Sequence, residues 1–324
     1  MKPLSNRFNK ILETKDINIE LDKRINDYLL NQDNNINTDI VKEFLAYINI
    51  DDKELIKDYS LNKIDKLDIN TYIENEYYKN IKIDKDIIYK KWTIKYSYYS
   101  PYQVFIYKDI TINKDNYYSE TNYLGYFSTS FKYLEVLEGD TTWMSITPHE
   151  INTMEDSINV ATGNILVLGL GLGYYPYMIS NKDSVKDVTI IELDKDVIDI
   201  FNRFILPQFK YKNKIHIINM DAIKYLKETN LNIYNYIFID LYHNPIDGLP
   251  FYLEISKLED IYKDITFSYW IKESILALKY RYLISLKEEL YNGSTYKDYI
   301  DESNIDNKIM KILYNEYKDI DIKL

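Results

Sequence analysis

The sequence has no cysteine, few glycines and few prolines: its 324 residues include 8 Gly and 7 Pro. The lack of cysteine excludes disulfide bonds, thiolate metal ligands and cysteine nucleophiles, and it fits a reducing compartment. The 3 histidines are far apart, so we expect no metal site. The longest apolar run, residues 165–179, contains three glycines and a proline and is too short to span a bilayer. We therefore predict a cytoplasmic protein that does not enter a membrane.

The sequence also lacks a concentration of positive charge. Lys and Arg number 40 against 51 Asp and Glu, which gives a formal net charge of -11 at pH 7, and the basic residues are scattered. Nucleic-acid binding needs clustered positive charge, so we expect no nucleic acid partner. The hydrophobic fraction of 46% and the chain length are sufficient for more than one domain with its own core.

Apolar spacing changes along the first half of the chain. Residues 1–91 have helical spacing, seen at Val41, Leu45 and Ile48, and predict a helical N-terminal region. Residues 92–147 instead contain β-prone runs separated by turn residues, which predicts a small antiparallel β-rich region with strands at 92–96, 103–107 and 131–137. This second region is a candidate for a homodimer interface or for a lid over a pocket, and the sequence leaves both open.

In residues 148–324, short apolar runs alternate with helical segments. Strands are predicted at 165–168, 188–191, 215–219 and 236–239, and helices at 175–180, 195–203 and 222–227. Strands that are apolar on both faces and separated by helices are typical of a Rossmann-like α/β fold, a doubly wound, mainly parallel sheet that binds ligands beyond the carboxyl ends of its strands. After residue 245 we expect a helical C-terminal extension, with its longest helix at 270–290.

A cluster of glycines follows the first predicted strand, at Gly169, Gly171 and Gly173. Glycine allows sharp turns and lets the backbone approach a ligand, and exposed N–H groups there can bind a carboxylate or phosphate. The alternative is a tight turn that packs a helix on a strand, and the cluster alone does not decide between them.

Acidic residues follow the next three strands. Glu192 ends the second strand, where a carboxylate can accept hydrogen bonds from a ribose diol. Asp221 follows the third strand and can either meet an adenine amino group or cap the helix that begins at Ala222. Asp240 ends the fourth strand, where the reacting centre of a ligand would lie.

Two further segments contain candidate residues. Thr147 or Ser145 is predicted to cap a helix that begins near Pro148, with Glu150 completing a capping box, and we favour this interpretation. The alternative places Glu150, with Trp143 and Met144, in the wall of a pocket. His243 is a candidate general base near pH 7, although an ordinary loop histidine is the simpler interpretation.

Together these motifs resemble those of the class I, Rossmann-like S-adenosylmethionine-dependent methyltransferase superfamily, and within it the spermidine synthase-like branch. The resemblance covers roughly residues 131–245 and depends on the runs VLGLGLG, IIELD, NMDA and FID, preceded by LEG and PHE. It implies that Gly169, Gly171 and Gly173 line the methionine part of S-adenosylmethionine. It further implies that Glu192 holds the ribose, that Asp221 and Ala222 meet the adenine, and that Asp240 lies near the sulfonium, with His243 as a second catalytic candidate.

One departure from that branch guides the functional prediction. Aminopropyl-transferring members carry a second aspartate in a D-x-x-D-P arrangement, whereas residues 241–245 here read LYHNP. We therefore predict an S-adenosylmethionine-dependent methyltransferase that acts on an unknown small-molecule or protein acceptor. The alternatives are a spermidine synthase-like aminopropyltransferase and a non-catalytic binding protein of this fold. An NAD-dependent oxidoreductase is less favoured, because its loop reads G-x-G-x-x-G.

Overall fold

The N-terminal region is mainly helical. The computed structural model describes residues 5–32, 39–293, 304–320 and 322–324. Helix α1 (Asn6–Leu30) begins where the Ser5 side chain accepts a hydrogen bond from the Phe8 N–H. Its C-terminal half packs its apolar face on α2 (Ile40–Tyr47), with Ile25 and Phe44 buried in one cluster. The short helices α3 (Lys53–Asp58), α4 (Ile69–Ile73) and α5 (Glu76–Asn80) follow.

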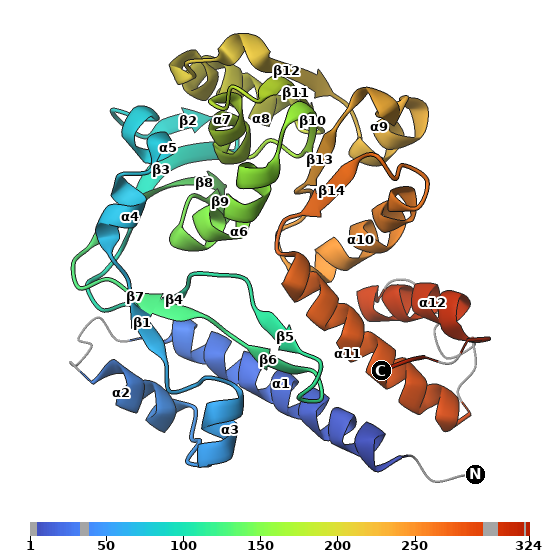
Figure 1. Ribbon diagram of the computed structural model, residues 1–324. Coiled ribbons are helices and arrows are strands. Elements are labelled where there is room, and N and C mark those ends of the chain that lie inside the picture. The colour runs from blue at the N-terminus through green and yellow to red at the C-terminus, as the bar shows by residue number, and fades with distance from the viewer. Residues whose placement is uncertain (1–4, 33–38, 294–303, 321) are drawn as a thin grey trace.

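Three small sheets precede the larger sheet of the molecule in the chain, and two of them lie next to α1 (Figure 1). An antiparallel sheet has the order β2-β3-β8-β9, made of β2 (Ile87–Tyr89), β3 (Trp92–Tyr99), β8 (Phe131–Glu138) and β9 (Thr141–Ser145). A second sheet has the order β1-β7-β4, made of β1 (Ile64–Lys66), β7 (Leu124–Tyr126) and β4 (Val104–Ile106). The hairpin strands β5 (Thr111–Asn113) and β6 (Ser119–Thr121) pair with each other.

The larger sheet has five parallel strands in the order β12-β11-β10-β13-β14. They are β10 (Gly163–Leu168), β11 (Val185–Glu192), β12 (Ile215–Asn219), β13 (Tyr236–Ile239) and β14 (Thr266–Tyr269). Strands β11 and β12 follow β10 on one side of it, and β13 and β14 then lie on the other side of β10. The strand order therefore reverses between β10 and β13, which is the point where ligands bind in open α/β sheets.

Helices cover both faces of this sheet. Figure 1 shows α7 (Tyr174–Ser180) and α8 (Lys195–Ile200) on one side, and α9 (Ala222–Glu228) and α10 (Pro245–Glu259) on the other. Helix α8 continues into a π-helical turn, Phe201–Ile205, and helix α6 (Pro148–Val160) leads from β9 into β10. Short 3-10 turns at Leu206–Gln208, Lys212–Lys214 and Leu231–Ile233 complete the connections.

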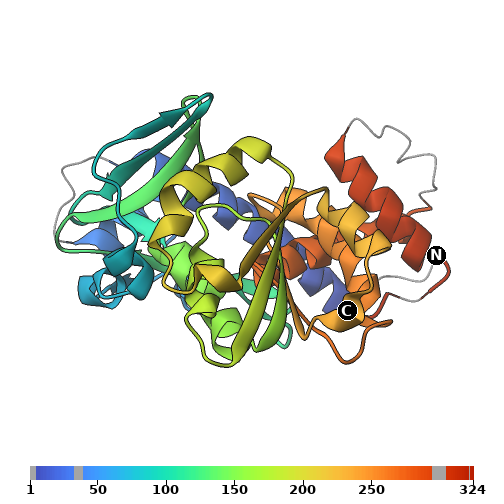
Figure 2. The same cartoon turned by 90° about the horizontal axis from the view of Figure 1, so that it is seen from above.

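The two ends of the chain meet on one side of the molecule. Helix α11 (Lys272–Tyr291) runs from the end of β14 along α1, and α12 (Ile305–Tyr317) packs against α10 and α11 (Figures 1 and 2). An ion pair of 2.8 Å between Lys257 and Glu316 joins α10 to α12. The second cavity described below lies between these terminal helices and the parallel sheet.

The predicted Rossmann-like α/β fold is confirmed, with its helical N- and C-terminal regions and its antiparallel strands. Strands β1 and β2 lie within residues 1–91, which were predicted to be helical. Two further details differ from the sequence analysis. The predicted helix at 270–290 begins at Lys272, because the preceding residues form β14 and its connection. Strand β12 is exposed over most of its length rather than buried on both faces, because it lies at the edge of the sheet.

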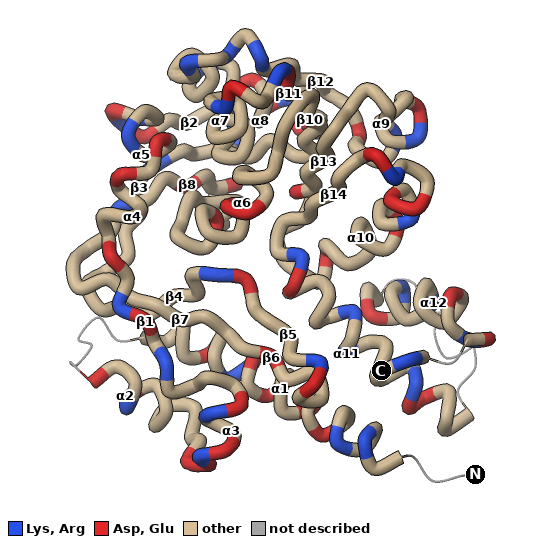
Figure 3. The backbone as a smooth tube through the Cα atoms, viewed as in Figure 1, with Lys and Arg blue, Asp and Glu red and all other residues tan. Residues whose placement is uncertain are grey.

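Acidic and basic residues are interspersed over the described elements (Figure 3). No helix among the described residues is long and apolar enough to cross a membrane. The same residues contain no group of three or more His, Cys, Asp or Glu side chains placed to hold a metal ion.

Candidate functional site

A cavity of about 410 Å³ opens beyond the carboxyl ends of β10, β11 and β13. We call it the donor cavity. Of the sequence-predicted site residues, seven line it: Gly169, Gly171, Glu192, Asp221, Ala222, Asp240 and His243. Trp143, Met144 and Glu150, the alternative wall residues of the sequence analysis, line it as well. The cavity thus brings together residues from four strand ends, from β9 and from the first turn of α6.

The glycine loop is shaped mainly by contacts within the protein. Gly169 has a φ of +96°, and a Cβ atom there would lie 1.9 Å from the backbone oxygen of Asp240. Glycine at this position therefore allows β10 and β13 to end side by side. Gly173 does not line the donor cavity; it precedes α7 with a φ of +73°, and a Cβ atom would meet the Phe201 ring at 2.3 Å.

Backbone N–H groups of the loop already have partners. The Gly169 N–H donates to the Ile191 oxygen at 2.9 Å, and the Leu170 N–H donates to Glu192 Oε2 at 3.1 Å. The Leu172 N–H points at Met144 Sδ at 2.8 Å, and the Gly173 N–H donates to the Leu170 oxygen at 2.9 Å. These four N–H groups are therefore not free to bind a carboxylate or phosphate.

Glu192 connects the glycine loop to the end of β11. Its Oε1 accepts from the Asp194 N–H at 2.7 Å, while Oε2 accepts from Leu170. Burial raises the pKa of Glu192, and these backbone hydrogen bonds oppose the rise. Each carboxylate oxygen has a second lone pair, so Glu192 can still accept from a ligand hydroxyl.

The carboxylates that follow the next two strands differ in their surroundings. Asp221 caps α9, because its Oδ1 accepts from the Lys224 N–H at 2.7 Å, and it also lines the donor cavity. Both roles considered for it in the sequence are thus compatible with its position. Asp240 lies on the wall of the cavity, where burial and then the Glu192 carboxylate raise its pKa to about 7.

The position of Glu150 corrects the favoured sequence interpretation. Thr147 is the N-cap residue of α6, but its side chain makes no capping hydrogen bond, and Glu150 does not complete a capping box. Glu150 instead faces the cavity, and its buried Oε2 accepts no hydrogen bond from the described residues. Burial, and then the Asp240 carboxylate, raise the pKa of Glu150 well above its usual range. The carboxyl groups of Glu150 and Asp240 therefore lie close enough to interact electrostatically.

A second cavity, of about 530 Å³, adjoins the first, and we call it the side cavity. Four residues border both cavities: Ser145, Glu150, His243 and Trp270. His243 is exposed, with its ring 6.0 Å from that of Trp143. His149 borders only the side cavity, where burial lowers its pKa to about 4 and keeps its imidazole neutral at pH 7.

Several wall residues were missed from the sequence. Trp270, Tyr242 and Phe251 line the donor cavity, yet Trp270 was assigned to a helix and the other two carried no local signal. The Tyr242 hydroxyl donates to the Trp270 oxygen at 2.7 Å and so ties the loop after β13 to the end of β14. The side cavity was also missed, because its walls come from segments far apart in the sequence.

Comparison with known proteins identifies one matching family and a set of similar folds. Residues 150–255 match the model of the spermine/spermidine synthase domain. No curated protein gives a significant match. The chain is similar to the crystal structure of spermidine synthase from Thermotoga maritima, with 15% identity and a TM-score of 0.32 over 47% of this chain and 59% of that one. A spermidine synthase in complex with the transition state analogue AdoDATO gives 14% identity, the same TM-score and the same coverage. The chain thus spans about three fifths of the length of these structures.

These findings correct two predictions. Methyl transfer is wrong as the main prediction, because the family matched at residues 150–255 makes spermidine and spermine by aminopropyl transfer. S-adenosylmethionine as a cofactor is wrong for the same reason, since that family uses the decarboxylated form as a substrate. Both errors came from the missing second aspartate after Asp240, whereas Glu150 brings a second carboxylate to the same cavity from another element. Residues 150–255 are therefore similar to the spermine/spermidine synthase domain.

Proposed function

We propose that this protein is an aminopropyltransferase, which moves the aminopropyl group of decarboxylated S-adenosylmethionine to an amine acceptor. The observation that carries the proposal is the acidic lining of the donor cavity. Its described lining contains the four carboxyl groups of Glu150, Glu192, Asp221 and Asp240, and neither Lys nor Arg. The spermine/spermidine synthase match at residues 150–255 supports the same class of transferase.

The charge of the cavity favours the decarboxylated donor over S-adenosylmethionine. Both molecules carry a positive sulfonium, but only S-adenosylmethionine adds a carboxylate, which would lie among acidic groups. No basic side chain of the lining is available to pair with that carboxylate, and the loop N–H groups of Gly169, Leu170 and Leu172 are already used. A buried unpaired charge is unfavourable, so the donor without the carboxylate fits this cavity better.

In the proposed reaction, the lone pair of the acceptor nitrogen attacks the aminopropyl carbon bound to sulfur. The new C–N bond forms as the C–S bond breaks, and sulfur keeps the bonding electron pair, which leaves neutral methylthioadenosine. The proton lost from the nitrogen passes to Asp240, whose raised pKa of about 7 suits a general base at neutral pH. Glu150, which also lines the cavity, holds the attacking amine in line with the C–S bond.

The remaining residues of the proposal hold the nucleoside. Glu192 accepts hydrogen bonds from the ribose hydroxyls, and Asp221 with the backbone of Ala222 meets the adenine. Gly169 and Gly171 form the wall beside the aminopropyl chain. These assignments follow from the family resemblance and from the common lining of the donor cavity.

The test compares donors and variants in one assay. Purified protein is titrated calorimetrically with decarboxylated S-adenosylmethionine and with S-adenosylmethionine, then incubated with the decarboxylated form and a panel of amines. We expect tighter binding of the decarboxylated form and release of methylthioadenosine with at least one amine. Asp240→Asn and Glu150→Gln should each lower kcat/KM about 100-fold or more.

Glu155→Gln is the matched control, because Glu155 lies on α6 with Glu150 but is exposed and outside both cavities. Its kinetics should equal those of the wild type. Equal affinity for the two donors, or binding without release of methylthioadenosine for any amine, contradicts the proposal. The second result would identify a binding protein rather than an enzyme.

A further inference from the structure

The side cavity extends from the reacting groups toward the terminal helices. One face of α11 forms its wall, with Ser274, Ala277, Leu278 and Arg281 at spacings of three and four. From Ile271 to Arg281 this wall is about 15 Å long, at about 1.5 Å per residue. Glu150 stands at the junction with the donor cavity, and the opposite end lies against α1.

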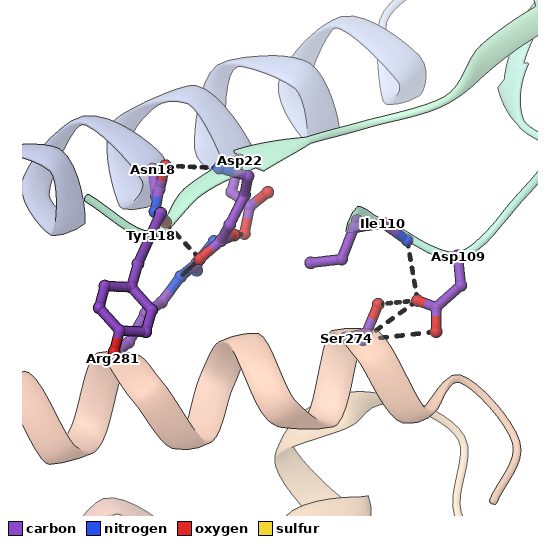
Figure 4. A network of polar contacts seen from close by, with 8 residues as sticks. Asn18, Asp22, Asp109, Ile110, Tyr118, Ser274 and Arg281 are labelled. Atoms are coloured by element: carbon purple, nitrogen blue, oxygen red, sulfur yellow. Dashed lines mark hydrogen bonds and ion pairs between the residues drawn. The ribbon is translucent and has the colours of Figure 1, made fainter. Parts of the chain in front are cut away.

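A charged cluster occupies the distant end. Arg281 pairs with Asp22 of α1 at 2.7 Å, and it also pairs with Glu120 of β6. Figure 4 shows Arg281 reaching from α11 toward Asn18 and Asp22 on α1. Asn18 donates to Glu120 Oε1 at 3.1 Å. One guanidinium thus faces two carboxylates, so the cluster has an excess negative charge.

The two carboxylates are not equally available to a ligand. Glu120 has only 4% of its side chain exposed and accepts from both Asn18 and Arg281, so it is enclosed. Asp22 has 37% of its side chain exposed and borders the cavity. Asn26, one turn further along α1, borders the cavity beside it. Asp22 is therefore the carboxylate that a ligand in the side cavity can reach.

Lys108 also lines the side cavity, away from the Asp22–Arg281–Glu120 cluster. Lys108 precedes Asp109, and Figure 4 places Asp109 beside Ser274, about two turns of α11 from Arg281. The Lys108 ammonium lies 5.6 Å from the Tyr107 ring centroid and 5.9 Å from that of Tyr123. An acceptor with a negatively charged far end would bind Lys108, whereas an acceptor with a positively charged far end would bind Asp22. Experiments can therefore distinguish these two classes of acceptor.

We propose that the side cavity is the acceptor site, and that it selects an elongated amine whose second cationic group binds Asp22 in the Asp22–Arg281–Glu120 cluster. This inference rests on the proposed function, because it assumes that the acceptor's reacting nitrogen lies at Glu150. The distant part of the site is built by α1, β6 and α11, which lie outside the segment matched by the family model. Asp22 is then a specificity-determining residue.

The test uses three acceptors with the same carbon chain: diaminooctane, octylamine and aminooctanoate. They differ only in the far group, which is positive, neutral or negative. KM is measured for each with decarboxylated S-adenosylmethionine and the wild type, Asp22→Asn or Asn26→Lys. We expect both variants to raise the ratio of KM for diaminooctane to KM for octylamine about tenfold. Asn26→Asp should lower the same ratio.

Asp27→Asn is the control, because Asp27 is an exposed carboxylate of α1 outside the side cavity. It should leave the ratio unchanged, and circular dichroism should show that all variants are folded. Turnover with a ratio that is insensitive to residues 22 and 26 overturns the inference and leaves the proposed function intact. A lower KM for aminooctanoate than for diaminooctane in the wild type, or an effect of Asp27→Asn equal to that of Asp22→Asn, also overturns it. Failure of every amine to release methylthioadenosine contradicts the proposed function instead.

Discussion

At the scale of single residues, Glu150 is a buried acid without a hydrogen-bond partner for Oε2 among the described residues. A pKa raised by folding means that the native state holds the proton more tightly than the unfolded chain. Its contribution to stability is therefore present below the unfolded pKa and is lost as the pH rises through the folded pKa. The ligand-free protein should become less stable between mildly acidic and alkaline pH.

Replacing this carboxyl should stabilise the ligand-free protein and reduce its activity. We expect Glu150→Gln to raise the free energy of unfolding by about 1–3 kcal/mol at pH 8, where the unfolded acid is ionised and folding must either protonate it or bury its charge. The gain should shrink at pH 5. Urea denaturation at both pH values measures it, with Glu155→Gln as the control. A destabilised Glu150→Gln protein at pH 8 would argue for a structural role.

Substitution of Gly169 tests whether the close approach of the ends of β10 and β13 requires glycine. Gly169→Ala should lower stability by about 2–5 kcal/mol, because the new Cβ would meet the Asp240 backbone oxygen and the φ of +96° strains any other residue. Gly293→Ala is the matched control, since Gly293 has a φ of +92° with nothing within 4 Å of a Cβ. Both variants introduce backbone strain, but only Gly169→Ala adds the clash with Asp240, so thermal denaturation of the two separates these contributions. Equal losses of stability in the two variants would show that the clash costs nothing.

At the scale of elements, a loop of the β-rich region fixes the start of α11. The residue before that helix, Ile271, provides no side-chain cap and has a φ of +43°, which is rare for a β-branched residue. Asp109, between β4 and β5, supplies the cap from outside. It accepts from the Glu273 N–H at 2.9 Å, from the Ser274 N–H at 3.1 Å and from the Ser274 hydroxyl.

Removing this external cap should loosen α11. Asp109→Ala should lower the free energy of unfolding by about 1–2 kcal/mol, which is typical for the loss of an N-cap. Amide hydrogen exchange should increase first in the opening turn of α11. Asp115→Ala, an exposed acid on the hairpin that follows Asp109, serves as control. Unchanged exchange in α11 would show that packing alone holds the helix start.

Elements with a strong local pattern were predictable from the sequence, and those defined by distant partners were not. The four apolar strands from β10 to β13 lie within a few residues of their predicted positions. Strand β14 was missed because Thr266 and Ser268 interrupt its apolar pattern. Strand β1 was missed because its partner, β7, is about sixty residues away in the chain. The pattern around Glu150 fits a capping box as well as a cavity wall, so the sequence could not separate them.

Site residues that belong to a local sequence pattern were likewise predictable, and those brought together by distant segments were not. Glu192, Asp221 and Asp240 were identified because the carboxyl ends of parallel strands share one edge. The wall formed by Trp270 and the side cavity depend on how terminal helices pack against the sheet, which no local motif encodes. The side cavity thus became visible only in three dimensions.

At the scale of the whole molecule, the acidic groups of the donor cavity should make activity depend on pH. As the pH falls below about 7, Asp240 takes up a proton, and the cavity loses negative charge. We expect kcat/KM for the cationic donor to fall by up to about tenfold per pH unit on this acidic side. Binding of neutral methylthioadenosine, followed by calorimetry, should depend on pH much less. A flat kcat/KM between pH 5 and 8 would contradict this account.

The ion cluster that joins Asp22 to Arg281 also determines when the site is completed during synthesis. Every described residue that lines the donor cavity lies between positions 142 and 270, whereas the side cavity needs helices from both ends of the polypeptide. Synthesis of the residues that line the donor cavity is therefore complete at position 270, eleven residues before Arg281. Closure of the side cavity has to wait until α11 has been synthesised.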